Sequence, residues 1–588
     1  MKKNVLALSI ATMVGGLGFA GAANATLSVN ESGAGHILIM PYYSAQNGNM
    51  SVFHLTNTDT TNGKAVKVRF RGASNSDDVL DFQVFLSPGD VWTAAVTKNP
   101  TTGLAQLTTA DKSCTFPNFY AEGYNGTVPF VTDRLTSHLW DTPAKKAEQT
   151  LEGYVEVLTM ADIPKPSVTL DATRQDPRLY TAIKHKNGVA PCTESVLAET
   201  LLVTANTKSI ANIDLKTKAA QKLGTGQLVG ETTFDLTRPA LAPSLVGQWY
   251  VLNVEKTTTF SAAMPAIVAS SQPHNVFSPQ RDNTGSAALV DGTGTGVNGP
   301  TLVTADPLMK ANIIKPQFYD VPDLSTPYET TAATPEAQAS ELTGSIARAS
   351  ISNQFASDAG IDAKTDWVFS LPTRRYAIAA NYAAANTQGA NVLSGVSVWD
   401  ATATPAALKA VVQTAAGTGA VAANTAGYRV VNPDVKVGAT GDNAFTAPGT
   451  SEHGVLNTVQ GGYTTVNAAG QICLTIPGSK IGFWDREETQ PTTTDKPVFS
   501  PGTPAKPNSM DLCGEVSVMA FSTDESALGA ALTRQSVNAK YTNGWGTLAS
   551  PVGHLPVLGS AFLKLSNPAA REGVSGTYGL TWSHSYTK

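Results

Sequence analysis

The sequence has little charge. Only 15% of its 588 residues are Asp, Glu, Lys or Arg, and the formal net charge is −5. Nucleic acids and anionic lipids bind basic surfaces, so a chain of this composition is a poor match for either of them. We therefore expect no nucleic-acid partner. A polar but weakly charged surface also reduces repulsion between identical copies, which favours self-association.

Sequence signatures of catalysis are also absent. There is no GxSxG nucleophile motif and no HExxH, and the eight histidines are scattered. Residues 294–299 match GxGxxG, but Pro300 follows at once and no helical pattern opens there. A bound pyrophosphate would therefore have no helix N-terminus to receive it. We expect that the protein is not an enzyme.

The N-terminal apolar stretch is too short for a transmembrane helix, which needs about 20 apolar residues. It covers residues 5–20, contains three glycines, follows Lys2 and Lys3, and is followed by Ala23, Asn24 and Ala25. This pattern predicts a secretory signal peptide over residues 1–25. The mature chain would begin at residue 26 and work outside the cytoplasm.

Cysteine is scarce, with four residues that form two separated pairs. No CxxC occurs and no cysteine has a histidine close by in sequence, which disfavours metal or redox chemistry. In an exported chain the natural pairing is Cys114 with Cys192 and Cys473 with Cys513, although four cysteines permit three connectivities.

Hydrophobic residues alternate with polar ones over many short segments. Residues 66–71 place Val66, Val68 and Phe70 on one face and three basic residues on the other. Similar strands are predicted at 50–57, 80–86, 154–159, 248–254, 367–371, 472–476 and 516–521. Short helical patterns occur only at 335–348 and 404–414. The sequence predicts an all-β protein built of antiparallel β-sandwich domains with long Ala/Thr/Gly-rich loops.

Composition divides the mature chain into three parts. We expect an N-terminal β domain at 26–268, a linker or insertion at 269–345 that is rich in glycine and proline, and a C-terminal β region at 346–588. The alternative is one interleaved sandwich in which late strands complete the first sheet.

Carboxylates cluster at three places that suit a loop-bound cation, one of which is Asp485 with Glu487 and Glu488. Asp77 with Asp78, and Asp282 with Asp291, are candidate calcium ligands, because Ca²⁺ prefers several oxygen ligands. None of the clusters matches an EF-hand, and the alternative is that each is simply solvated. Asp81 either faces water or pairs with a basic strand residue such as Arg69.

Tryptophans raise the possibility of carbohydrate binding, since their rings can stack on sugar faces. Most of them lie in strand-like sequence, where packing in the core is the default role. Trp545 lies between Gly544 and Gly546 and is the one we expect to be exposed.

Four segments resemble parts of large exported surface proteins of Gram-negative proteobacteria. They are GHILIMPYY (35–43), VKVRFRGASNSDDVLDFQVFLSPGDVWTAAV (66–96), TDWVFSLPTRRY (365–376) and YGLTWSHSY (578–586). The layout is similar to that of the surface-layer proteins that form the casing of nanopods. The resemblance implies a non-catalytic protein of the outer cell surface that assembles with itself into a lattice or tube, and it carries over no active-site residue.

Attachment to outer-membrane lipopolysaccharide is the simplest hypothesis, because the sequence shows no lipobox cysteine at the cleavage site and no cell-wall-binding repeats. The alternative function is an exported adhesin, or a module that binds a glycan or another protein.

Overall fold

The computed structural model describes most of the residues toward the two ends of the chain, from residue 27 on, and short parts of its middle. The described residues are 27–163 except 122 and 136–139, 165, 177–193, 197, 221–222, 228–229, 241–270, 273, 276, 322–328, 335–380 except 377, 396–400, 407–414, 417–420, 464–466, 471–487, and 509–587 except 522–524, 538, 540, 552–553 and 573. The predicted signal peptide and the aspartates Asp282 and Asp291 lie outside them.

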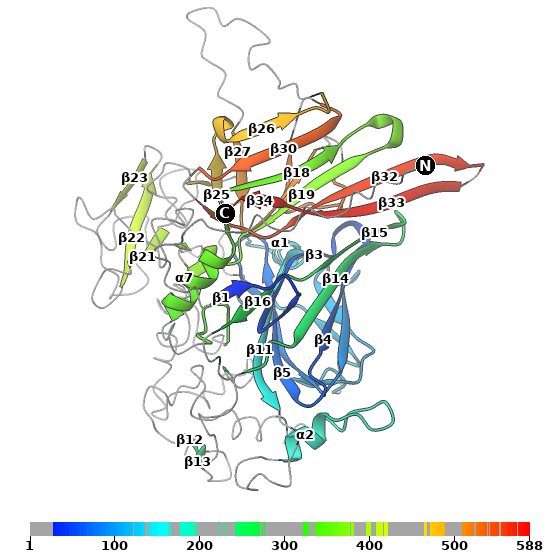
Figure 1. The fold of residues 1–588 in the computed structure, drawn as a ribbon, viewed down its shortest axis with the longest axis vertical. Coiled ribbons are helices and arrows are strands. Elements are labelled where there is room, and N and C mark those ends of the chain that lie inside the picture. The colour runs from blue at the N-terminus through cyan, green and yellow to red at the C-terminus, as the bar shows by residue number, and fades with distance from the viewer. Residues whose placement is uncertain are drawn as a thin grey trace, which may run out of the picture.

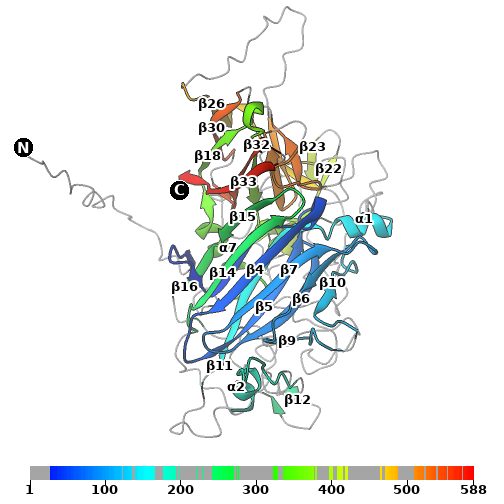
Figure 2. The same cartoon turned by 90° about the vertical axis from the view of Figure 1, so that its right-hand side faces the viewer.

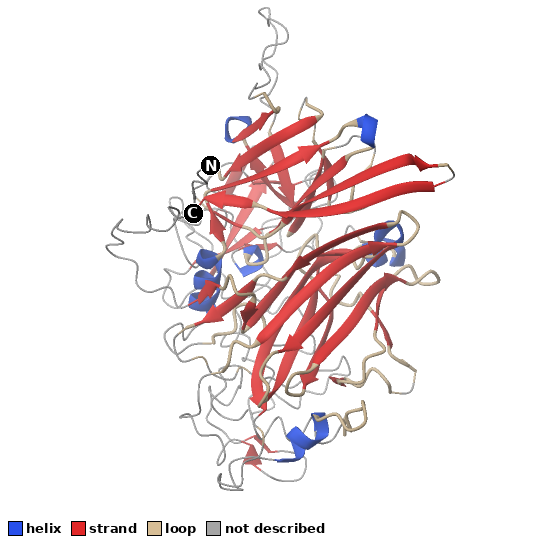
Figure 3. Ribbon diagram, turned by 45° about the vertical axis from the view of Figure 1, so that its right-hand side comes forward, coloured by secondary structure: helices blue, strands red, loops and turns tan. Residues whose placement is uncertain are grey.

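Strands dominate the described residues, and the predicted all-β class is confirmed (Figure 3). The N-terminal part forms two large sheets. The first sheet has the order β1 (Leu27–Val29), β16 (Ala266–Ala269), β3 (Ile37–Ser44), β11 (Glu152–Ile163), β5 (Gly63–Gly72), β6 (Asp78–Leu86), β9 (Cys114–Phe116). The second sheet has the order β10 (Thr127–Pro129), β8 (Ala105–Thr108), β7 (Val91–Lys98), β4 (Asn49–Asn57), β14 (Leu245–Asn253), β15 (Thr258–Ala263), with β2 (Ala34–Gly35) also paired to β14.

These two sheets pack face to face as an N-terminal sandwich, in which the long strands β4, β7 and β14 lie side by side (Figure 2). The alternation read from residues 66–71 puts Val66, Val68 and Phe70 into the core. Phe70 meets Phe53 of the opposite sheet with ring centroids 5.8 Å apart. Burial of such aromatic side chains supplies the main driving force for joining the sheets.

The C-terminal part forms a second sandwich above the first (Figure 1). Its outer sheet has the order β26 (Ile481–Trp484), β30 (Asn543–Ala549), β18 (Ser350–Ala356), β34 (Ser585–Thr587). Its inner sheet has the order β29 (Arg534–Ser536), β28 (Val516–Ala520), β19 (Lys364–Ser370), β32 (Ser560–Arg571), β33 (Val574–Ser583). β28 and β29 are parallel, and the other pairs of both sheets are antiparallel.

Smaller elements surround the two sandwiches. Among the described residues, the α-helices are α1 (Pro143–Glu148), α2 (Pro177–Ile183) and α7 (Pro335–Ser345). The small sheets are β12 (Gln221–Lys222) with β13 (Leu228–Val229), β17 (Ala347–Arg348) with β31 (Leu555–Pro556), β20 (Ile378–Ala380) through β21 (Val396–Asp400) and β22 (Ala407–Thr414) to β23 (Gly417–Ala420), and β24 (Thr464–Val466) through β25 (Ile472–Ile476) to β27 (Met510–Cys513).

One of the two predicted helical segments is wrong. α7 lies within the segment predicted at 335–348, but residues 407–414 form strand β22, paired on both sides. Val411, Val412 and Thr414 are β-branched, which disfavours helix and suits a pleated strand. Pairing with two neighbours then outweighed the helical preference of the alanines.

Both predicted disulfides are present. Cys114 in β9 bonds Cys192, and Cys473 in β25 bonds Cys513 in β27. Such bonds form and persist in oxidising compartments, so the protein works in a non-cytoplasmic environment. Within the described ranges, no helix has the length and apolar character needed to cross a membrane.

The central strand of the inner sheet, β19, is buried on both faces. On β19, Trp367 points toward the outer sheet, where its ring lies 6.4 Å from that of Phe483. The next residue, Val368, belongs to the apolar core that also contains residues of the first sandwich. Phe562 of β32 meets Trp249 and Phe260 of the N-terminal sandwich at centroid distances of 6.0 and 5.6 Å. The two sandwiches therefore share one apolar core.

A loop at 525–533, between β28 and β29, joins the two sandwiches through two buried carboxylates. Glu152 of β11 accepts hydrogen bonds from the backbone N–H groups of Leu532 and Thr533, at 2.7 and 3.1 Å. The Tyr42 hydroxyl donates to the same carboxylate at 2.7 Å. From the other side, Asp366 of β19 accepts from the backbone N–H of Leu528 at 2.8 Å and from the Ser526 hydroxyl. We call this segment the clamp loop.

Replacing Glu152 by Ala is expected to destabilise the protein by about 3 kcal/mol or more, because several buried donors lose their acceptor at once. Glu148→Ala, on the exposed side of α1, is the matched control and is expected to change stability by less than about 0.5 kcal/mol. Urea unfolding of the mature protein measures both. Equal unfolding curves for the two variants would contradict the role assigned to Glu152.

Candidate functional site

The basic face of β5 is inside the protein. The exposed fractions of Lys67, Arg69 and Arg71 are 0%, 0% and 1%. Period-two alternation was read correctly from the sequence, but both faces of this strand are covered. Burying three cations is costly unless each is paired, so their partners decide what this face can do.

Acidic residues on the neighbouring strands supply the partners. Asp81 of β6 lies directly opposite Arg69 in the strand register, yet its carboxylate pairs with Lys67 at 2.6 Å. Arg71 contacts Glu156 of β11, with its Nε 3.0 Å from the carboxylate oxygen. Because β5 lies between β6 and β11, each cation can reach an anion on an adjacent strand.

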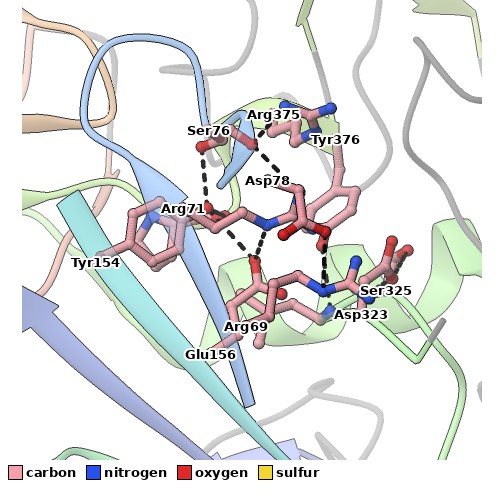
Figure 4. A network of polar contacts seen from close by, with 12 residues as sticks. Arg69, Arg71, Ser76, Asp78, Tyr154, Glu156, Asp323, Ser325, Arg375 and Tyr376 are labelled. Carbon is pink, nitrogen blue, oxygen red and sulfur yellow. Dashed lines mark hydrogen bonds and ion pairs between the residues drawn. The ribbon is translucent and has the colours of Figure 1, made fainter. Parts of the chain in front are cut away.

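Asp78, one of the candidate calcium ligands, lies within this network (Figure 4). One of its oxygens lies 2.8 Å from Arg134 Nη1 and 3.5 Å from Arg69 Nε. Asp77 is buried beside it. Over the residues that the structure describes, no three His, Cys, Asp or Glu side chains gather as a metal site. Calcium binding stays a prediction.

The network extends into the second sandwich. The backbone oxygen of Ser76 accepts from Arg71 Nη1 at 3.2 Å and from Arg375 Nη1 at 2.6 Å, and Figure 4 shows the two arginines converging there. The hydroxyl of Tyr154 contacts the Ser76 hydroxyl at 2.9 Å. Because these side chains are buried, the network fits a role in holding the two parts of the fold together.

Glu515 is a further buried acid at the contact between the two sandwiches. It lies between β27 and β28, and its backbone N–H donates to the Ala73 carbonyl of the first sandwich at 2.7 Å. Burial raises the pKa of its carboxyl from 4.5 to about 7, while Arg374 and Arg375 oppose the rise. The folded protein therefore holds a proton that the unfolded chain releases near its ordinary pKa.

Glu515 contributes stability that is complete below about pH 4.5 and is lost as the pH rises through about 7. The glutamine of the Glu515→Gln variant does not titrate. The free energy of unfolding of this variant, relative to that of the wild type, is therefore expected to increase between pH 5 and pH 8, by up to about 3 kcal/mol. Urea unfolding at the two pH values measures this. Exposed Glu255→Gln is the control, and a difference for Glu515→Gln that does not change with pH would refute the assignment.

The last strand of the inner sheet leaves a long edge without a partner. β33 pairs with β32, and no other described strand pairs with it. It is ten residues long, whereas the other edge strands among the described sheets have two to six residues. Figure 1 shows β32 and β33 projecting together beyond the body of the protein as an arm.

One face of β33 packs and the other faces solvent. A Cβ placed on Gly579 would lie 2.2 Å from the Thr259 carbonyl oxygen, so this face lies against β15. Tyr578 and Leu580, on the opposite face, are 64% and 42% exposed. The ten residues contain no charge and no proline, the usual means by which edge strands avoid pairing with other chains.

A hollow of about 380 Å³ lies at the base of this arm. Trp545 of β30 and Trp582 of β33 line it, together with polar side chains of β18 and of the 583–585 segment. Trp545 is 41% exposed, as the sequence predicted, and its ring stacks on Trp484 at 4.2 Å with an interplanar angle of 13°. Trp92, Trp249 and Trp367 are core residues.

Comparison with known proteins finds no matching family model, no similar curated protein and no similar solved structure.

Sequence reasoning missed the edge of β33. The sequence signal lies in residues 574–583. This segment has no charged residue, and Tyr578, Leu580 and Trp582 occupy alternate positions in it. That pattern predicts a strand, but only the sheet order reveals that the strand has no outer neighbour. The exposure of Trp545 was predicted, whereas its pairing with Trp484 depends on the register of β26 and β30.

Proposed function

We propose that the protein is a non-catalytic, self-assembling component of the outer surface of a Gram-negative cell, where copies form a coat. The observation that carries this proposal is the free, uncharged edge of β33. Two disulfides support a location outside the cytoplasm. The weakly charged composition agrees with it, as does the resemblance of four segments, residues 578–586 among them, to large exported surface proteins, with a layout similar to that of nanopod surface-layer proteins.

The proposed contact is addition of a strand from a second copy to β33. An unpaired edge presents backbone N–H and C=O groups that another strand can satisfy, and side chains on the sheet face add apolar contact. Tyr578 and Leu580 would be covered when this happens. The nearest charged side chains along the strand are at its start, at Arg571 and Glu572, so repulsion along the edge is small.

A second copy is the partner that fits this edge best. The same ten-residue strand is available on every molecule, so two copies can pair β33 with β33 around a twofold axis. Such a contact extends the five-stranded inner sheet into the partner. A coat requires at least one further contact on each copy, and the calcium and lipopolysaccharide hypotheses concern contacts of that second kind.

Leu580→Lys is expected to weaken self-assembly at least about tenfold, measured as the protein concentration needed for assembly, because it places a charge on the edge. Analytical ultracentrifugation and negative-stain electron microscopy of residues 26–588 measure this. Both are run with millimolar Ca²⁺ and with chelator, which tests calcium separately.

Val189→Lys is the matched control, since Val189 is an exposed aliphatic residue, 52% against 42% for Leu580, in a turn far from the arm. It is expected to assemble like the wild type. A wild-type protein that stays monomeric at all concentrations would overturn the proposal of self-assembly. Assembly of Leu580→Lys at the wild-type concentration would overturn the role of β33.

A further inference from the structure

The hollow at the base of the arm is formed where the chain passes from one sheet of the second sandwich to the other. β18 pairs with β34 only from Ser350 to Ser352, and the next residue of β18, Asn353, contacts the crossing chain at residues 582–584. Trp582, the last aromatic residue of β33, forms one wall. Trp545, opposite Gln354 in the strand register, forms another.

The rings are held in place before any ligand arrives. Trp545 stacks on Trp484 of the adjacent strand, and the Trp484 ring lies over Gly482, where a Cβ would come within 2.2 Å of it. Asn353 Nδ2 lies 3.3 Å from the carbonyl oxygens of Trp582 and Ser583, which fixes the crossing chain. A site arranged in advance loses less entropy on binding.

Polar groups without charge surround the rings. The other lining side chains are the Gln354 and Asn353 amides and the hydroxyls of Ser352, Ser583 and Ser585. Amides and hydroxyls both donate and accept hydrogen bonds. None of the lining residues in the described part of the chain is charged, so these residues offer no ion pair to a phosphate, a carboxylate or an amine.

We propose that this hollow binds a neutral sugar ring of an oligosaccharide or polysaccharide. A pyranose presents an apolar C–H face to an aromatic ring and hydroxyls around its rim, which matches an exposed tryptophan surrounded by amides and hydroxyls. The volume is at the lower end of the range for small-ligand sites. The inference does not depend on self-assembly, because Tyr578 and Leu580 are not lining residues.

The test uses the mature protein on an array of neutral and acidic bacterial glycans, followed by calorimetric titration with the best neutral saccharide. Saturable binding of a neutral saccharide is expected, and Trp545→Ala is expected to weaken it at least about tenfold. Tyr124→Ala, which removes an equally exposed aromatic ring from the N-terminal sandwich, is expected to leave it unchanged. Gln354→Ala, at an exposed position, tests the polar rim with little risk to folding.

Three results would overturn the proposal. The first is no binding to any glycan on the array, and the second is binding that neither Trp545→Ala nor Gln354→Ala weakens. The third comes from comparing binding to intact lipopolysaccharide with binding to the polysaccharide released from it. Binding of both supports a sugar site, whereas binding of intact lipopolysaccharide alone would assign recognition to its lipid.

Discussion

The clamp loop, held between two buried carboxylates, is the constraint on which the rest of the structure depends. Glu152 from the first sandwich and Asp366 from the second both accept hydrogen bonds from backbone N–H groups of this one segment. Burial raises the pKa of both acids, to about 6 for Asp366, and the hydrogen bonds oppose that rise. A displaced loop would leave charged or polar groups without partners in the interior, which is why the two sandwiches have one relative position.

That fixed position gives the arm its place. β32 lies against the first sandwich through Phe562, and β33 lies against β15 where Gly579 allows close approach. The N-terminal sandwich therefore supports one face of β33, while Tyr578 and Leu580 stay on the other face. The two proposals meet on β33, since the backbone edge of the strand would pair with a second copy, whereas the Trp582 side chain near its end would contact sugar.

Local patterns made the fold class and many strands predictable. Residues 472–476 were predicted as a strand and are one, and those at 367–371 and 516–521 differ from β19 and β28 by a few residues at the ends. The alternation of hydrophobic and polar residues, and the turns that bound each strand, can be read from the sequence. The disulfide pairs followed from the small number of cysteines and the predicted export of the chain. Which face of a strand is covered is a tertiary property. For that reason the burial of Lys67 and Arg69, and the pairing of Asp81 with Lys67, could not be read from alternation alone.

Hydrogen exchange of the assembled protein, compared with the dispersed protein, tests the central claim most directly, since a strand added to an edge protects the edge amides from exchange. The account predicts that the amides of residues 574–583 become strongly protected on assembly, while those of the clamp loop, protected in both states, do not change. Assemblies in which residues 574–583 exchange as fast as in the monomer would contradict it, and the copies would then meet elsewhere.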